Sequence, residues 1–174
     1  MSDKNSKHVN PCTHHCNFPI AGPQGIPGPG STLFFSKDQG DAPITIPANS
    51  NNFQIMTVIV KTTEHNQLVK LDATVSTEVL PTGGVTNFQY GVRYAIFRDA
   101  AVTPLISALQ QGNYDRSLGF LLYDWQPNFT FVDTVASPGF HIYRIVATET
   151  FPRLNIDSIT VRNRGFTATV FPAV

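Results

Sequence analysis

The sequence predicts an all-β protein, an antiparallel jelly-roll sandwich of about eight strands that follows an extended, Pro/Gly-rich N-terminal tail. Three observations predict this fold class. Segments rich in β-branched and aromatic residues recur along the chain and are separated by turn signals. They do not alternate with helical patterns, as the strands of a parallel sheet would. Eight of the twelve residues from 19 to 30 are Pro or Gly, which separates the tail in composition from everything that follows.

The expected strands begin after a short apolar patch, Leu33-Phe34-Phe35, and a polar turn over residues 36–41. They are residues 44–46, 53–63, 68–80, 87–98, 129–135, 140–150, 156–162 and 165–171. Segment 68–80 alternates well, with Val69, Leu71, Ala73, Val75 and Thr77 on one face. Residues 104–111 (PLISALQQ) are expected to form one short helix. We therefore divide the chain into a connector, residues 1–42, and a jelly-roll head, residues 43–174.

Aromatic residues dominate the strand expected at 87–98. Phe88, Tyr90, Tyr94 and Phe97 are expected to pack in the core and between the sheets. Trp125 lies in a predicted loop, where it either anchors an interface, as Trp often does, or plugs one end of the sandwich. The sequence does not separate these two roles.

Composition excludes several classes of function. Of the 174 residues, 41% are hydrophobic, so a core can form, but only 14% are charged and the formal net charge is zero. A neutral chain does not suit nucleic acid or an anionic membrane as a partner. No apolar run approaches the roughly 20 residues of a membrane helix. Low charge favours a chain that buries its faces against neighbours, and the polar start predicts no secretory signal peptide.

The sequence offers little for catalysis. It contains no nucleophile elbow, phosphate loop, dinucleotide fingerprint or zinc-protease motif. The head has two histidines, His65 beside Glu64 and His141 near a strand start, and isolated polar residues at strand ends are usually solvated. We expect neither an enzyme nor a cofactor.

Collagen-like triplets occupy residues 22–30 of the tail. Gly22, Gly25 and Gly28 recur at every third position, and Pro23 and Pro27 pre-set the polyproline II backbone. Only Gly fits at the crowded axis of three chains, so this period is consistent with three-chain packing. A stiff, extended linker is the other interpretation, and it remains open.

Two cysteines, Cys12 and Cys16, lie ahead of these triplets among His8, His14 and His15. Such a cluster could bind zinc, but the spacing is C-x3-C and no second pair of ligands follows. A disulfide, either local or between subunits, is favoured over unpaired thiols and over a metal site. We expect no bound metal.

One segment of the head resembles a known trimeric fold. Residues 137–143 (SPGFHIY) form a Pro-Gly turn that leads into an alternating aromatic strand, and this is similar to a strand of C1q-like and tumour-necrosis-factor-like jelly rolls. Those domains are trimers, often carried on collagen-like stalks. The resemblance therefore implies a homotrimer.

A broader resemblance covers most of residues 53–171. Residues 69–75 (VKLDATV), 90–99 (YGVRYAIFRD) and 161–170 (VRNRGFTATV) resemble a family of small β-domains from endospore-forming bacteria, associated with the spore coat, the exosporium and its fibres. Within that group, a short collagen-like tail on a jelly-roll head resembles subunits of the thin F-type endospore appendage. The collagen-like part is far shorter than in hair-like exosporium glycoproteins, so it would serve as a connector.

The resemblance implies a function, a location and a set of partners. It implies a structural subunit of a spore-surface fibre, made in the mother-cell cytosol and deposited on the exosporium, with itself and other exosporium or spore-coat proteins as partners. In such a fibre, the tail of one trimer would dock into the next head, a contact that propagates because it never closes. The residues expected to plug and connect are Phe18, Pro19, Ile20, Gly22, Pro23, Gly25, Pro27 and Gly28.

Two other functions stay open. One is a trimeric, C1q-like binding or tip module on a short stalk, whose candidate ligand-binding loops are residues 99–118 and 123–128. The other is an anchor that attaches a different fibre to the exosporium.

Overall fold

The computed structural model describes residues 30–38, 42–117 and 122–173. These residues form strands, turns and bends and contain no helix, which confirms the all-β prediction. The strands are β1 (Thr32–Asp38), β2 (Ile44–Thr45), β3 (Phe53–Thr62), β4 (Gln67–Pro81), β5 (Asn87–Arg98), β6 (Ile106–Asp115), β7 (Tyr123–Trp125), β8 (Asn128–Val135), β9 (Gly139–Leu154) and β10 (Ile156–Val170).

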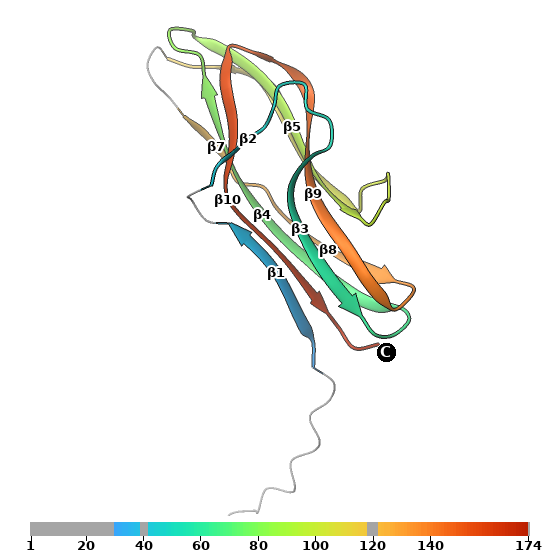
Figure 1. Cartoon of the computed structure of the whole chain (residues 1–174). Coiled ribbons are helices and arrows are strands. Elements are labelled where there is room, and N and C mark those ends of the chain that lie inside the picture. Colours follow the sequence, from blue (N-terminus) through green and yellow to red (C-terminus); the bar gives the residue numbers. More distant parts are fainter. Residues whose placement is uncertain (1–29, 39–41, 118–121, 174) are drawn as a thin grey trace, which may run out of the picture.

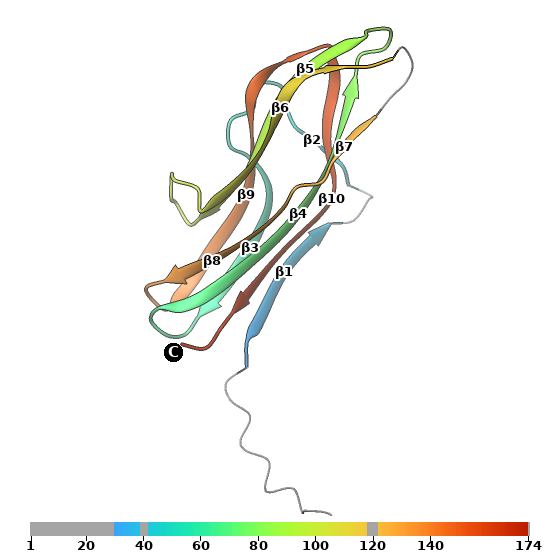
Figure 2. The ribbon, with the colours of Figure 1, turned by 180° about the vertical axis from the view of Figure 1, so that it is seen from behind.

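The strands form two antiparallel sheets that pack face to face as a jelly-roll sandwich (Figures 1 and 2). The six-stranded sheet has the order β1-β10-β4-β7, with β2 also paired to β10 and β8 to β4. The four-stranded sheet has the order β3-β9-β5-β6. From β3 to β10 the chain changes sheet at most connections, so each sheet contains strands that are distant in sequence.

The expected helix at residues 104–111 is wrong. This segment belongs to β6, which pairs along its length with β5, from Ile96↔Ile106 to Asn87↔Asp115. Alternate β6 residues are partly buried and exposed, and Ile106 and Ala108 pack against the core. Helix propensity in the PLISALQQ segment is therefore overridden by the hydrogen bonds and side-chain contacts that β5 provides.

The segments expected at 156–162 and 165–171 form the single strand β10. It pairs with β4 through a register shift between Val161 and Arg164. Such a bulge changes which side chains face inward while the strand continues. Two apparent strands in the sequence are therefore one strand with an irregular middle.

The head begins earlier than the expected boundary after residue 42. Strand β1 pairs with β10 over its whole length, from Thr32↔Val170 to Asp38↔Arg164. Phe34 packs against the core, while Leu33 and Phe35 are 61% and 64% exposed. The apolar patch that the sequence places in the connector is thus an edge strand of the six-stranded sheet.

The core lies between the two sheets and follows the predicted alternation. Its largest fully buried side chains include Tyr90, Tyr94, Tyr143, Phe88, Phe166, Leu71 and Ile96. Phe97 departs from the expectation: it is buried, but in a small separate cluster with Ala95 and Val146. Gly91 sits at irregular pairing between β5 and β9, where an added Cβ would lie 2.6 Å from the Cβ of Phe151. Close approach of the two strands therefore requires glycine here.

Arginines tie several connections to the sheets. Arg116 donates hydrogen bonds to the carbonyls of Thr82 and Val85 in the β4–β5 turn. Arg153 donates to the carbonyls of Ile46 and Pro47, 2.9 and 3.0 Å away, between β2 and β3. These guanidinium groups satisfy loop carbonyls that no strand partner reaches, so the connections are held in defined positions.

Candidate functional site

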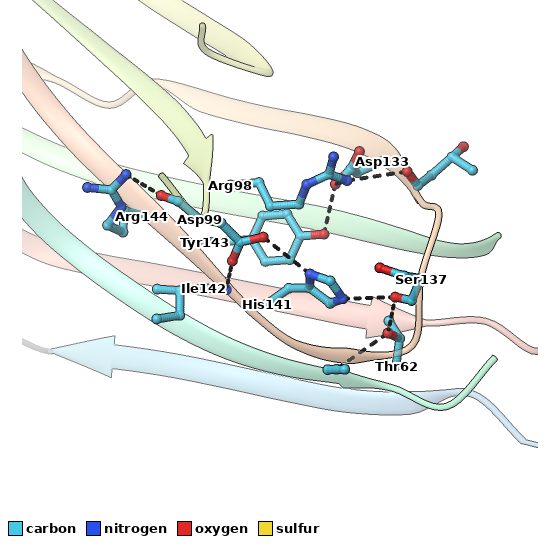
Figure 3. Close-up of polar contacts among 11 residues, drawn as sticks. Thr62, Arg98, Asp99, Asp133, Ser137, His141, Ile142, Tyr143 and Arg144 are labelled. Carbon is cyan, nitrogen blue, oxygen red and sulfur yellow. Dashed lines mark hydrogen bonds and ion pairs between the residues drawn. The ribbon is translucent and has the colours of Figure 1, made fainter. Parts of the chain in front are cut away.

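A cluster of polar side chains joins the two sheets at the end that carries the β8–β9 turn (Figure 3). Asp133, on β8 of the six-stranded sheet, accepts two hydrogen bonds through Oδ2. Arg98 of β5 donates from Nη1 at 2.7 Å, and Tyr143 of β9 donates from its hydroxyl at 2.8 Å. The Asp133 side chain is 8% exposed, so a carboxylate is buried between the sheets with both partners in place.

Burial and charge determine the titration of this cluster. Burial is the main cause that raises the pKa of Tyr143, and its contact with Asp133 adds to this, while Arg98 opposes it. Burial by itself would lower the pKa of Arg98, but attraction to Asp133 outweighs it and raises that pKa. The cluster is therefore an ion pair whose carboxylate also accepts a hydrogen bond from a neutral phenol, and it links the two sheets.

Asp99, which follows Arg98 in the chain, makes a second group of contacts, with residues of β9. Its φ is positive, at 51°, and its N–H donates to the carbonyl of Ile142 at 2.7 Å. Its Oδ1 accepts from the N–H of Ile142 at 2.8 Å, and its carbonyl accepts from Arg144 at 2.5 Å. Asp99 thus takes the place of a strand residue beside β9.

His141 lies between Asp99 and the β8–β9 turn. Its Nδ1 is 3.2 Å from Oδ2 of Asp99, and its Nε2 is 3.2 Å from the carbonyl oxygen of Ser137. Ser137 contributes its backbone carbonyl to this contact, whereas a Ser-His-Asp triad needs the serine hydroxyl on the imidazole. The geometry holds the turn in place and gives no activated nucleophile.

The second histidine faces the same turn. His65 Nδ1 lies 2.8 Å from the carbonyl oxygen of Ala136, and the hydroxyl of Thr62 donates to the carbonyl of Ser137 at 3.2 Å. The sequence predicts both histidines as isolated residues at strand ends, and the structure brings both to the β8–β9 turn. No spacing in the sequence indicates this, because the contact depends on pairing between β3 and β9.

A shallow polar hollow of about 380 Å³ lies on the outer face of the six-stranded sheet. Its lining includes Asp72, Thr74, Asn128, Thr130 and Thr167. Thr130 donates to Asp72 at 2.6 Å, and Thr74 donates to Asn128 at 2.6 Å. Partial burial opposes ionisation of Asp72, but hydrogen bonds from Thr130 and Lys70 lower its pKa. These polar groups already satisfy one another, so the hollow contains no reactive centre.

Within residues 30–38, 42–117 and 122–173, no group of three or more His, Cys, Asp or Glu side chains could hold a metal ion. In the same residues, no helix has the length and apolarity to cross a membrane.

The predicted assembly residues fall mostly outside the described residues. Cys12, Cys16 and the connector residues Phe18, Pro19, Ile20, Gly22, Pro23, Gly25, Pro27 and Gly28 all lie in the part of the tail that the structure does not describe. Trp125 is described: it ends β7, is partly buried against the core, and its ring centroid is 5.5 Å from that of Tyr94. Its ring therefore fills space between the sheets.

The candidate binding loops prove to be partly strand. Residues 106–115 of the first form β6, and residues 123–125 of the second form β7. About half of the two candidate ligand-binding loops is therefore paired strand, to β5 and to β4.

Eight of the eleven large apolar side chains that are exposed among the described residues lie on the outer faces of the two sheets. Leu33, Phe35, Leu68 and Val132 belong to the six-stranded sheet, and we call their side of it the six-strand face. Ile59, Leu109, Phe140 and Ile142 belong to the four-stranded sheet and form the four-strand face.

Comparison with known proteins gives few matches. No protein-family model matches the chain, and no curated protein matches it. Among solved structures, a chain of the infectious bursal disease virus Gx strain is similar at 12% identity and a TM-score of 0.41, covering 87% of this chain and 40% of that one. The VP2 subviral particle of the same virus is similar at 13% identity and a TM-score of 0.41, covering 83% of this chain and 37% of that one. The chain thus spans about two fifths of the length of these viral chains, and the likeness carries no functional inference.

Proposed function

We propose that the chain is a structural subunit that assembles with copies of itself into a fibre on the spore surface. The observation that carries the proposal is the six-strand face, where exposed apolar side chains surround charges that are already paired. Leu33 and Phe35 of β1 are more than half exposed, and Val132 of β8 is 51% exposed. Covering a surface of this kind with another protein is favourable in free energy, because apolar area is removed from water and few charges lose their solvation.

The charges of this face favour a second copy as the covering partner. Lys70 pairs with Asp72 at 2.9 Å, and Arg162 pairs with Glu78. Each pair has one cation and one anion, so these four side chains add no net charge to the face and give no reason for two copies to repel each other. Self-association of heads through this face, as a homotrimer, is the form that the resemblance to C1q-like domains favours.

The position of β1 supports a connector that links heads. Strand β1 begins at Thr32, directly after the collagen-like triplets, and it is an edge strand of the six-stranded sheet. A connector that starts there leaves from the sheet through which the heads associate. Three connectors would leave one trimer together, and we propose that each docks its Phe18-Pro19-Ile20 segment into the next head.

The location on the exosporium and the partnership with other spore-coat proteins rest on the family resemblance. The proposal involves no catalytic step, cofactor, nucleic acid or membrane. A trimeric binding module is less well supported, because about half of its candidate loops is paired strand. An anchor for a different fibre would need a dissimilar partner for the same face.

Negative-stain electron microscopy of the full-length recombinant protein tests the proposal. We expect regular fibres, and we expect discrete trimer-sized particles after deletion of residues 1–20. Phe35→Asp should abolish assembly, because it places a charge in the contact. Phe140→Asp is the matched control, since it alters a similarly exposed phenylalanine on the opposite face.

Each outcome separates the candidate functions. Discrete trimers from the intact chain would overturn the fibre and favour the binding module. Fibres that persist without residues 1–20 would overturn the connector role, and fibres that persist with Phe35→Asp would overturn the assignment of the six-strand face. Circular dichroism confirms that each variant is folded.

A further inference from the structure

The four-strand face contains a compact group of apolar and cationic side chains on its two neighbouring strands β3 and β9. Ile59 and Lys61 come from β3, and Phe140, Ile142 and Arg144 come from β9. We call this group the β3–β9 patch. Phe140 is 72% exposed, Ile59 56% and Ile142 41%. These side chains point away from the core, because the intervening residues of both strands are buried or partly buried.

The strand register arranges the patch in three rows across the two strands. Lys61 is opposite Phe140, Ile59 is opposite Ile142, and Arg144 is opposite Thr57. Lys61 Nζ lies 5.8 Å from the centroid of the Phe140 ring. Successive rows are two residues apart, or about 6.6 Å. The two cations therefore lie in the outer rows, about 13 Å apart along the strands, with the two isoleucines in the row between.

A small hollow adjoins the row of Arg144. It measures about 180 Å³ and is lined by Asn52, Phe97, Ala101, Val102, Arg144 and Val146. Phe97 and Val146 are nearly buried and give it an apolar floor, while Val102 is 92% exposed. The patch is thus continuous with a pocket that suits one apolar side chain.

Neither Lys61 nor Arg144 forms an ion pair within the part of the chain that the structure describes. Arg144 donates to the backbone carbonyl of Asp99, whereas the Asp99 carboxylate contacts the N–H of Ile142 and the ring of His141 (Figure 3). The patch therefore presents two cations that are not held in ion pairs beside exposed apolar surface, whereas Lys70 and Arg162 of the six-strand face are each paired with a carboxylate.

We propose that the β3–β9 patch binds an extended protein segment with the pattern acidic-x-apolar-x-acidic. In an extended segment, residues two apart lie on one face about 6.6 Å apart, which matches the spacing of the rows. One carboxylate then meets Lys61, the apolar side chain covers Ile59 and Ile142, and the second carboxylate meets Arg144. A further apolar side chain beyond the second carboxylate enters the hollow.

The middle row decides between a protein segment and a polyanion. A nucleic acid or sulfated polysaccharide would place charge along its whole length, and its central charges would lose solvation against Ile59 and Ile142 without a partner. A segment that alternates acids with apolar residues avoids this cost. The inference is independent of the fibre proposal, because it concerns the opposite face.

Titration of full-length protein with a fluorescent peptide tests the inference by anisotropy. The probe is Ser-Glu-Ser-Leu-Ser-Glu-Ser-Leu-Ser, and its controls replace both Glu by Lys or both Leu by Ser. We expect only the probe to bind, and we expect Lys61→Gln and Ile142→Thr each to weaken binding about tenfold. Lys70→Gln, on the six-strand face, is the matched control and should leave binding unchanged.

Three results would overturn the inference. They are absence of probe binding by folded protein, equal binding of the Lys peptide, and probe binding that neither Lys61→Gln nor Ile142→Thr weakens. A heparin fragment is the polyanion probe. If it binds more tightly than the peptide and Ile142→Thr leaves its binding intact, the patch is a polyanion site and the proposed pattern is wrong.

Discussion

The two ends of the sandwich join the same two sheets by different chemistry. At the end with the β4–β5 turn, Phe88 and Tyr114 of the four-stranded sheet meet Tyr123 of the six-stranded sheet. The Phe88 ring centroid lies 5.1 Å from that of Tyr114 and 4.6 Å from that of Tyr123. At the other end, the join is the buried contact of Asp133 with Arg98 and Tyr143.

The difference shows how each end tolerates change. Aromatic packing depends on buried area and shape. Removing one ring therefore leaves a cavity, and the free energy of unfolding falls in proportion to the size of the buried group that was removed. An ion pair between sheets depends on having both partners, so removing one leaves a charge without compensation. The aromatic end should therefore respond to side-chain volume, and the polar end to pairing.

The largest effect is expected at the aromatic end. Phe88 is 1% exposed and contacts the rings of Tyr90, Tyr114 and Tyr123, so Phe88→Ala should lower the free energy of unfolding by about 4 kcal/mol. Urea unfolding followed by circular dichroism measures this. Phe140→Ala, at a 72% exposed position, is the control and should change stability by less than about 0.5 kcal/mol. Equal effects would contradict the assigned packing.

A somewhat smaller effect is expected at the polar end. Asp133→Ala should cost about 3 kcal/mol, because Arg98 and Tyr143 lose their shared acceptor. The double variant Asp133→Leu with Arg98→Met removes both charges and should be more stable than Asp133→Ala. Unfolding in urea compares the two. A double variant that is less stable than Asp133→Ala would show that the pairing is not what matters.

The smallest effect is a pH dependence that distinguishes the ends. The pKa of Tyr143 is raised above the ordinary value of 10.0, so the unfolded chain releases this proton first as pH rises. Stability from Tyr143 is therefore present below about pH 10 and declines above it. Tyr143→Phe should cost about 1 kcal/mol at neutral pH and make the alkaline decline less steep. Unfolding midpoints of the wild-type protein and of Tyr143→Phe at a series of pH values test this. If the midpoints of both proteins fell equally steeply above about pH 10, the assignment would be contradicted.

The polar end was much harder to predict from sequence than the aromatic end. Phe88, Tyr90 and Tyr94 lie at alternate positions of one segment, so their burial follows from the period of a strand. Asp133 also lies at an alternating position, but its partners come from β5 and β9, and nothing local indicates that they meet. The same holds for His65 and His141, which converge on one turn only because β3 pairs with β9.

The sequence by itself determined the all-β class and the approximate position of most strands, because alternation and turn residues are local properties of the chain. Tertiary structure decided the rest. It made residues 106–115 a strand, because β5 supplies partners that a helix would forgo. It joined two predicted strands through a bulge into β10 and added β1 to the head, because pairing energy depends on neighbours that are distant in sequence. It also brought Lys61 and Arg144 to opposite ends of one patch, since only register fixes which residues of two strands lie side by side.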